Sequence, residues 1–132
     1  MKTITKEMLR IYKPISNLDW MNYKLVKDKA TFHHIVKREN GGKELIENGA
    51  ILMPEAHQYL HIIEYKEADV YKMLENMFRM INEQGHEPTE DQRFVIEYLL
   101  CSFESRHKGD ENSKGKKLIR HKYLNRGYTP KR

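Results

Sequence analysis

The sequence predicts a small α+β domain in which a two-stranded antiparallel hairpin, followed directly by a helix, is embedded in a mainly helical chain. Three observations predict it. The chain has 132 residues, which suits one domain. A segment rich in β-branched and aromatic residues (30–37) and a segment that contains Ala50, Ile51 and Leu52 flank a Gly-Gly turn. Apolar residues then recur at helical spacing as far as residue 103.

The first half of the chain supplies the hairpin. A short helix is expected around residues 6–12, followed by an irregular run past Pro14. Residues 30–37 predict a strand, and residues 47–53 a returning strand. Between them, Asn40-Gly41-Gly42 is a turn signal, because Asn and Gly tolerate positive φ.

Three helices are predicted after the hairpin. The first begins at Pro54, where a missing N–H is not needed, and runs to about Tyr65. The second ends at Gly85, and Thr89 with Gln92 forms a capping-box start for the third. The Met, aromatic and aliphatic side chains at helical spacing are interpreted as core rather than as a ligand site. They include Val70, Met73, Leu74, Met77, Phe78, Ile81, Phe94, Val95, Tyr98, Leu99 and Phe103.

The positive charge of the chain is concentrated at its C-terminal end. The formal net charge is +5, and residues 106–132 hold ten Lys or Arg against two acidic residues. Such a segment indicates an anionic partner, with a nucleic-acid backbone as the first candidate. The alternative is a solvated tail that aids solubility. Residues 108–117, which are Lys, Gly, Ser, Asn and acidic residues, predict a flexible linker.

Several classes of protein are disfavoured by composition. No apolar run approaches the ~18 residues of a membrane span, and residues 1–13 lack the apolar segment of a signal peptide. The lone Cys101 excludes an internal disulfide and the zinc sites built from cysteine pairs. We therefore expect a cytoplasmic protein that does not contact a membrane.

Four of the seven histidines lie between residues 32 and 61. His57 and His61 are spaced i, i+4 on a predicted helix, so both rings lie on one face and could grip one metal ion. Taken alone, such a pair is also typical of surface or core histidines. His33 and His34 lie on a strand, where successive side chains face opposite sides.

This alternation predicts different tasks for His33 and His34. One would complete a three-imidazole metal site that keeps coordination positions open, and the other would stay free as a general base near neutral pH. A closed structural zinc would need a fourth ligand. His86 is a candidate, but nothing in the sequence brings it close, so the open type is favoured.

The stretch HHIVKRENGGKELIENGAILMPEAHQYLH resembles the HNH endonuclease motif, the ββα-metal finger. The shared features are the His-His pair, the Gly-Gly loop, an Asn that opens the second strand, and two His on the helix. With both helix histidines, the stretch is most similar to the colicin-type DNases. The resemblance covers residues 31–65. It implies a nuclease domain over residues 1–107, with supporting helices at 66–105 and a basic tail at 108–132.

The resemblance implies a role for each motif residue. His33, His57 and His61 take the metal-ligand positions, and His34 takes the position of the general base. Asn48 takes the position that bridges the loop or, in some members, touches the metal, although Asn48-Gly49 could also be only a turn. The implied activity is hydrolysis of DNA phosphodiester bonds with one divalent ion, giving 5′-phosphate and 3′-hydroxyl ends.

The sequence leaves alternatives for the identity of the metal and for the residues that contact phosphate. Three imidazoles suit zinc or nickel, whereas the family is often active with magnesium or manganese. Lys37 or Arg38 lies close enough in sequence to contact a phosphate, although both could be solvated charges. In the tail, the candidate nucleic-acid contacts are Lys116, Lys117, Arg120, Lys122 and Arg126.

The chain also departs from the family pattern. Many small HNH proteins carry two CxxC pairs, which are absent here, and residues 66–105 match nothing in the family. Two alternatives therefore stay open. The chain could be a catalytically silent regulator that binds nucleic acid, expected to be double-stranded DNA, or protein. It could also be a structural metal fold without chemistry. A homodimer is a further expectation, because paired cuts often need two active sites.

Overall fold

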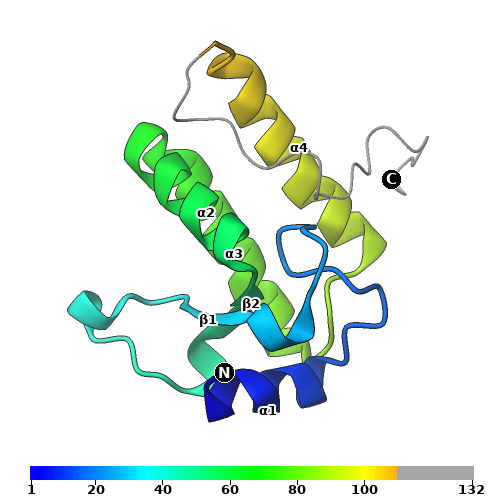
Figure 1. Ribbon diagram of the computed structural model, residues 1–132. Helices are drawn as coiled ribbons and strands as arrows, with labels where there is room; N and C mark the ends of the chain where they lie inside the picture. Colours follow the sequence, from blue (N-terminus) through cyan, green and yellow to red (C-terminus); the bar gives the residue numbers. More distant parts are fainter. Residues whose placement is uncertain (110–132) are drawn as a thin grey trace.

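The computed structural model describes residues 1–109, which form four α-helices and one two-stranded sheet (Figure 1). This confirms the predicted α+β class with a hairpin followed by a helix. The helices are α1 (Thr3–Tyr12), α2 (Pro54–Lys66), α3 (Ala68–Gln84) and α4 (Glu90–Arg106). The strands are β1 (Thr31–His34) and β2 (Gly49–Leu52), with short 3₁₀ turns at Lys27–Lys29, Arg38–Asn40 and Ile46–Asn48.

The hairpin lies between α1 on one side and the paired helices α2 and α3 on the other (Figure 1). Strands β1 and β2 are antiparallel, with His33 opposite Ala50 and His34 opposite Gly49. Side chains alternate as predicted. His33 points toward α3, where its ring meets that of Phe78 at 5.8 Å, while Phe32 and His34 share the other face with ring centroids 4.9 Å apart. The alternation therefore separates the two neighbouring histidines.

The strands are shorter than predicted: residues 30, 35–37, 47–48 and 53 do not belong to the sheet, and most of the difference lies on the loop side. The Asn48 side chain explains this, because its amide occupies both the N–H and the C=O of Val36, at 2.8 and 3.0 Å. The chain then turns through Gly41, which has φ +89°. A Cβ on Gly42 would lie 1.7 Å from the Val36 carbonyl oxygen, so only glycine fits there.

The predicted helix boundaries after the hairpin are confirmed. Pro54 occupies the first turn of α2, and Gly85 caps α3 in the left-handed conformation. Thr89 and Gln92 form both hydrogen bonds of the capping box at the start of α4. Helix α1 begins at Thr3, three residues earlier than residue 6, where the sequence placed it.

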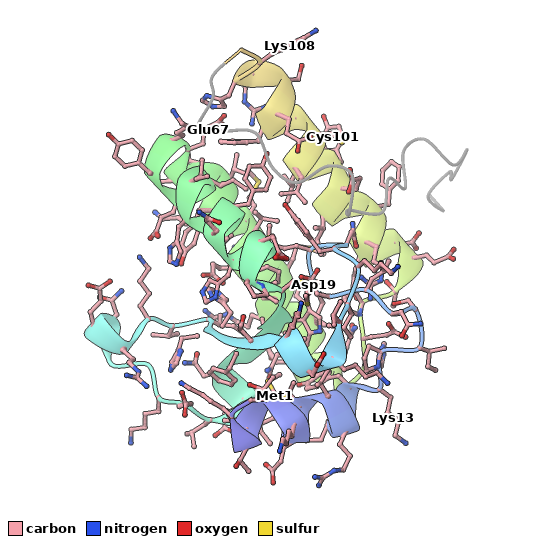
Figure 2. The ribbon with its side chains drawn as sticks, in the orientation of Figure 1. Met1, Lys13, Asp19, Glu67, Cys101 and Lys108 are labelled. Carbon is pink, nitrogen blue, oxygen red and sulfur yellow. The ribbon has the colours of Figure 1, made fainter. Side chains whose placement is uncertain are left out.

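The segment from residue 13 to residue 26 was expected to be irregular, and it contributes heavily to the core. Trp20, Met21 and Tyr23 are buried, and the Trp20 N–H donates to the carbonyl of Ile51 beside the hairpin. Asp19 is fully buried near the centre of the molecule (Figure 2). This segment is therefore part of the core and is hydrogen-bonded to the start of α2 and to α4.

Two further sequence-based expectations concern a membrane span and the basic tail. No helix within residues 1–109 is long and apolar enough to span a membrane. The basic residues predicted to bind nucleic acid in the tail lie outside the described residues. They are Lys116, Lys117, Arg120, Lys122 and Arg126.

Candidate active site

The four clustered histidines meet at one pocket of about 320 Å³. It forms where the end of β1, the following loop and the first turns of α2 come together, with α3 behind them. The lining residues are His33, His34, Lys37, Arg38, Glu39, His57, His61 and Tyr71. All four histidines of the motif therefore share a single concave surface with two basic side chains.

His33 is the most enclosed of the four, with 4% of its surface exposed. Its two ring nitrogens face different partners. Nδ1 lies 3.2 Å from Nε2 of His57, and Nε2 lies 2.9 Å from each carboxylate oxygen of Glu75. The ring is thus fixed at both nitrogens, by α2 on one side and α3 on the other.

His57 is held as a neutral imidazole. Burial, together with the neighbouring histidines His33, His61 and His34, lowers the pKa of His57 to about 4. A neutral ring keeps a lone pair for a cation at neutral pH. Two nitrogens bound ~2.0–2.1 Å from a tetrahedral zinc would be about 3.3 Å apart, which is close to the 3.2 Å between His33 Nδ1 and His57 Nε2.

His61 lies one helical turn after His57, as its spacing predicted. The two rings are stacked, with centroids 5.1 Å apart and an interplanar angle of 16°. The His61 side chain is 62% exposed, and its Nδ1 lies 3.8 Å from Glu64. His61 therefore lies at the rim of the pocket, and its ring faces Glu64.

These three rings do not converge on one point. Within residues 1–109, no group of three or more His, Cys, Asp or Glu side chains is arranged to hold a metal ion. His33 and His57 present a ligand pair, and His61 would join it only after its exposed side chain rotates away from Glu64. His86 does not line the pocket: its Nδ1 bonds to the backbone oxygen of Glu87, at the turn between α3 and α4.

His34 lines the same pocket from the end of β1. Its Nε2 is enclosed and has no hydrogen-bond partner among the described residues. Proton exchange with water in the pocket would therefore use Nδ1. Burial lowers the pKa of His34, and the positive charge of Arg38 lowers it further, so the ring is neutral and able to accept a proton near pH 7.

The two basic residues that line the pocket differ in their freedom. Lys37 forms an ion pair with Glu64, lies 5.6 Å from the centroid of the Tyr71 ring, and has its pKa raised chiefly by the bond to Glu64. Arg38 is 72% exposed and only approaches Glu44, at 3.5 Å. Arg38 is thus the loop cation that can turn toward an incoming anion at low cost.

Asn48 does not line the pocket. Besides its two bonds to Val36, its amide nitrogen donates to the carbonyl of Lys43 at 2.9 Å. Asn48 thus holds the two ends of the 35–48 loop together, which matches the loop-bridging role and supplies no contact to a metal or a substrate.

Reasoning from the sequence missed three residues of this site: Glu64, Tyr71 and Glu75. They lie far along the chain from His33, and Glu75 is 42 residues away. One local signal existed. Glu75 is spaced i+4 from Tyr71 and i−3 from Phe78, on the buried face of α3, and a carboxylate at such a position needs a partner.

Comparison with known proteins does not assign the chain to a family. No family model, no curated protein and no solved structure matches the chain.

Proposed function

We propose that the protein is a metal-dependent endonuclease that hydrolyses DNA phosphodiester bonds. The main support is the approach of His33 Nδ1 and His57 Nε2 to 3.2 Å in the pocket that His34 also lines. The order of hairpin and helix, and the resemblance of residues 31–65 to the HNH motif, point the same way.

The donor set suits a divalent cation. Both candidate ligands are imidazoles, and the low pKa of His57 keeps its ring neutral, as ligation requires. His33 and His57 would hold the ion, and the exposed His61 would swing in as the third ligand. When bound, a divalent ion would stabilise the charge that develops on the phosphoryl and leaving oxygens.

The chain's own residues account for the rest of the chemistry. His34, neutral and next to the ligand pair, accepts a proton from water at Nδ1 as that water attacks phosphorus. The bond from phosphorus to the 3′ oxygen breaks, and the leaving 3′ oxygen takes up a proton from solvent. Arg38 binds a phosphate oxygen, because its guanidinium is exposed and at the rim of the pocket. Lys37, engaged with Glu64, holds the loop against α2, so it contributes to the shape of the pocket.

The test is nicking of supercoiled plasmid by purified protein with magnesium, manganese, zinc or nickel. His34→Ala is expected to lower the rate by roughly 10²–10⁴-fold, the usual contribution of a general base. His86→Ala is the matched control, because His86 is exposed and lies outside the pocket, and it should cut at the wild-type rate. Full activity of His34→Ala would contradict the assignment. DNA binding by the wild type without cleavage under any metal would identify a binding regulator instead.

A further inference from the structure

Glu75 of α3 is a nearly buried carboxylate directed at the candidate metal site. It is 7% exposed, and both of its oxygens lie 2.9 Å from Nε2 of His33. Tyr71, one turn earlier on α3, hydrogen-bonds to Glu75. Tyr71 on the same helix therefore holds the Glu75 carboxylate, and Glu75 in turn holds the His33 ring of β1.

This contact determines which nitrogen of His33 carries the proton. The two 2.9 Å contacts to carboxylate oxygens assign Nε2 of His33 as the donor, because a carboxylate oxygen accepts the hydrogen bond. In a neutral imidazole the other nitrogen then keeps its lone pair. That nitrogen, Nδ1, is the one that lies 3.2 Å from His57.

A purely structural role explains less of this geometry. Burying Glu75 costs free energy, and a buried His33–Glu75 pair adds little stability relative to apolar side chains of similar volume. The apolar neighbour Phe78 already packs on the His33 ring, so another apolar residue at position 75 would suffice to fill the core. The carboxylate adds direction: it orients the His33 ring and fixes its protonation.

We propose that Glu75 is a positioning residue of the metal centre, which holds His33 with Nδ1 unprotonated and directed at the cation, and that Tyr71 holds Glu75. This inference depends on the proposed function, in which His33 and His57 bind the ion. It assigns to α3, which has no counterpart in the HNH motif, a direct task at the site. Carboxylates that accept from a metal-bound histidine commonly set its tautomer in this way.

The arrangement has a consequence for His57. When the His33 ring carries its one proton on Nε2, its Nδ1 is an acceptor, and the 3.2 Å contact then places a proton on Nε2 of His57. With metal, that nitrogen must give up its proton to bind the ion. The neutral His57 ring therefore changes tautomer on metal binding, its proton moving from Nε2 to Nδ1 through solvent, while His33 keeps its tautomer.

The first measurement uses metal-free wild-type protein and needs no activity. Long-range ¹H–¹⁵N spectra of the imidazoles report which ring nitrogen is protonated. We expect protonated Nε2 on both His33 and His57, and on addition of Zn²⁺ we expect only His57 to switch. An unprotonated Nε2 on metal-free His33 would overturn the proposal.

The second measurement is the affinity for Zn²⁺, determined by competition with a chelator. Glu75→Gln, which keeps an acceptor but loses the charge, and Glu75→Met, which loses both, should each weaken binding by roughly 10–100-fold. Glu83→Gln is the matched control, because Glu83 is exposed on the same helix, and its affinity should stay at the wild-type value. Circular dichroism confirms that each variant is folded.

The outcomes separate this proposal from the function on which it depends. Unchanged zinc affinity in both folded Glu75 variants overturns the positioning role and leaves the nuclease proposal intact. Absence of zinc binding by the wild type overturns both. If the variants do not fold, the tautomers of the wild-type protein still decide whether Glu75 acts on His33.

Discussion

Two clusters of polar side chains lie inside this small domain, and the protein satisfies them to very different degrees. The Asp19–Arg93 cluster comprises Asp19, Asn22 and Arg93, which are all 0–1% exposed. The histidine pocket comprises His33, His34, His57 and His61 and their neighbours. The first cluster is closed and hydrogen-bonded to the backbone and side chains around it, whereas the second is concave and leaves ring nitrogens available.

In the Asp19–Arg93 cluster, hydrogen bonds connect segments that are distant in sequence. Asp19 accepts from the backbone N–H groups of Met21, Tyr23 and Met53, at 2.8, 2.9 and 2.8 Å. Arg93 donates to the carbonyl oxygen of Asp19 at 2.7 Å and to Asn22 at 3.1 Å. These bonds attach α4 and the start of α2 to the segment of residues 13–26, so the cluster belongs to the scaffold.

In the histidine pocket, the donors and acceptors are incomplete. His34 Nε2 is enclosed without a partner among the described residues, and the 3.2 Å between His33 and His57 is also suited to a shared ligand. Buried polar groups normally find partners, and exceptions concentrate at functional sites. The comparison teaches that full satisfaction marks the scaffold here, while incomplete satisfaction beside open space marks the site.

The largest expected effect is the loss of stability when the scaffold cluster is broken. Arg93→Met leaves the backbone carbonyl oxygen of Asp19 and the carboxylate of Glu87 without their guanidinium partner and should lower the free energy of unfolding by about 3–5 kcal/mol. Urea unfolding followed by circular dichroism measures it. Arg79→Met, on the exposed surface of α3, is the control and should change stability by less than about 0.5 kcal/mol. A loss below about 1 kcal/mol for Arg93→Met would remove the distinction between the two clusters.

The next effect is on Zn²⁺ binding, and it concerns the histidine pocket. His57→Ala removes one of the two imidazoles of the ligand pair, so affinity for Zn²⁺ should fall by more than about 100-fold, or roughly 2.7 kcal/mol. Stability of the metal-free protein should change by less than about 1 kcal/mol, because His57 is a partly exposed group at a pocket wall.

Zinc titration by calorimetry and urea unfolding in chelator measure the two quantities on the same sample. His86→Ala should change neither. If His57→Ala destabilised the metal-free protein as strongly as Arg93→Met, His57 would be part of the scaffold. That result would contradict the assignment of the pocket as a metal-binding site.

The same comparison explains what could be predicted from the sequence. The hairpin, α2, α3 and α4 were predictable because their signals are local: Gly41-Gly42 in the loop, Pro54 at a first turn, Gly85 at a last one and the Thr89 capping box. The clustering of the four histidines followed from their positions on one strand and one helix face.

The interactions that complete each cluster could not be predicted in this way. Arg93 contacts Asp19 across 74 residues, and Glu75 contacts His33 across 42. Such pairs depend on how the elements pack, and neither residue has a periodic signature that names its partner. The predicted strands were too long for a related reason, since the side chain of Asn48 replaces the partner strand at Val36.

The last expected effect is a pH dependence within the scaffold cluster, with a small slope per pH unit. Burial raises the pKa of Asp19 to about 7, although its three backbone N–H bonds and the charge of Arg93 lower it. The pKa in the folded protein is thus above the unfolded value of 3.8. The stability that Asp19 contributes is therefore fully present below about pH 4 and is lost as pH rises through 7.

Urea unfolding of the wild type between pH 4 and 8 should show this loss, with a slope of at most about 1.4 kcal/mol per pH unit from this one proton. Asp19→Asn cannot titrate, so the difference between the two curves isolates the carboxyl group, even though the variant also loses the acceptor for the Met53 N–H. A difference that stays constant from pH 4 to 8 would mean that Asp19 remains ionised and that its hydrogen bonds outweigh its burial. The Asp19 carboxylate would then be a buried charge at all these pH values, and its contrast with the neutral rings of His34 and His57 would be sharper still.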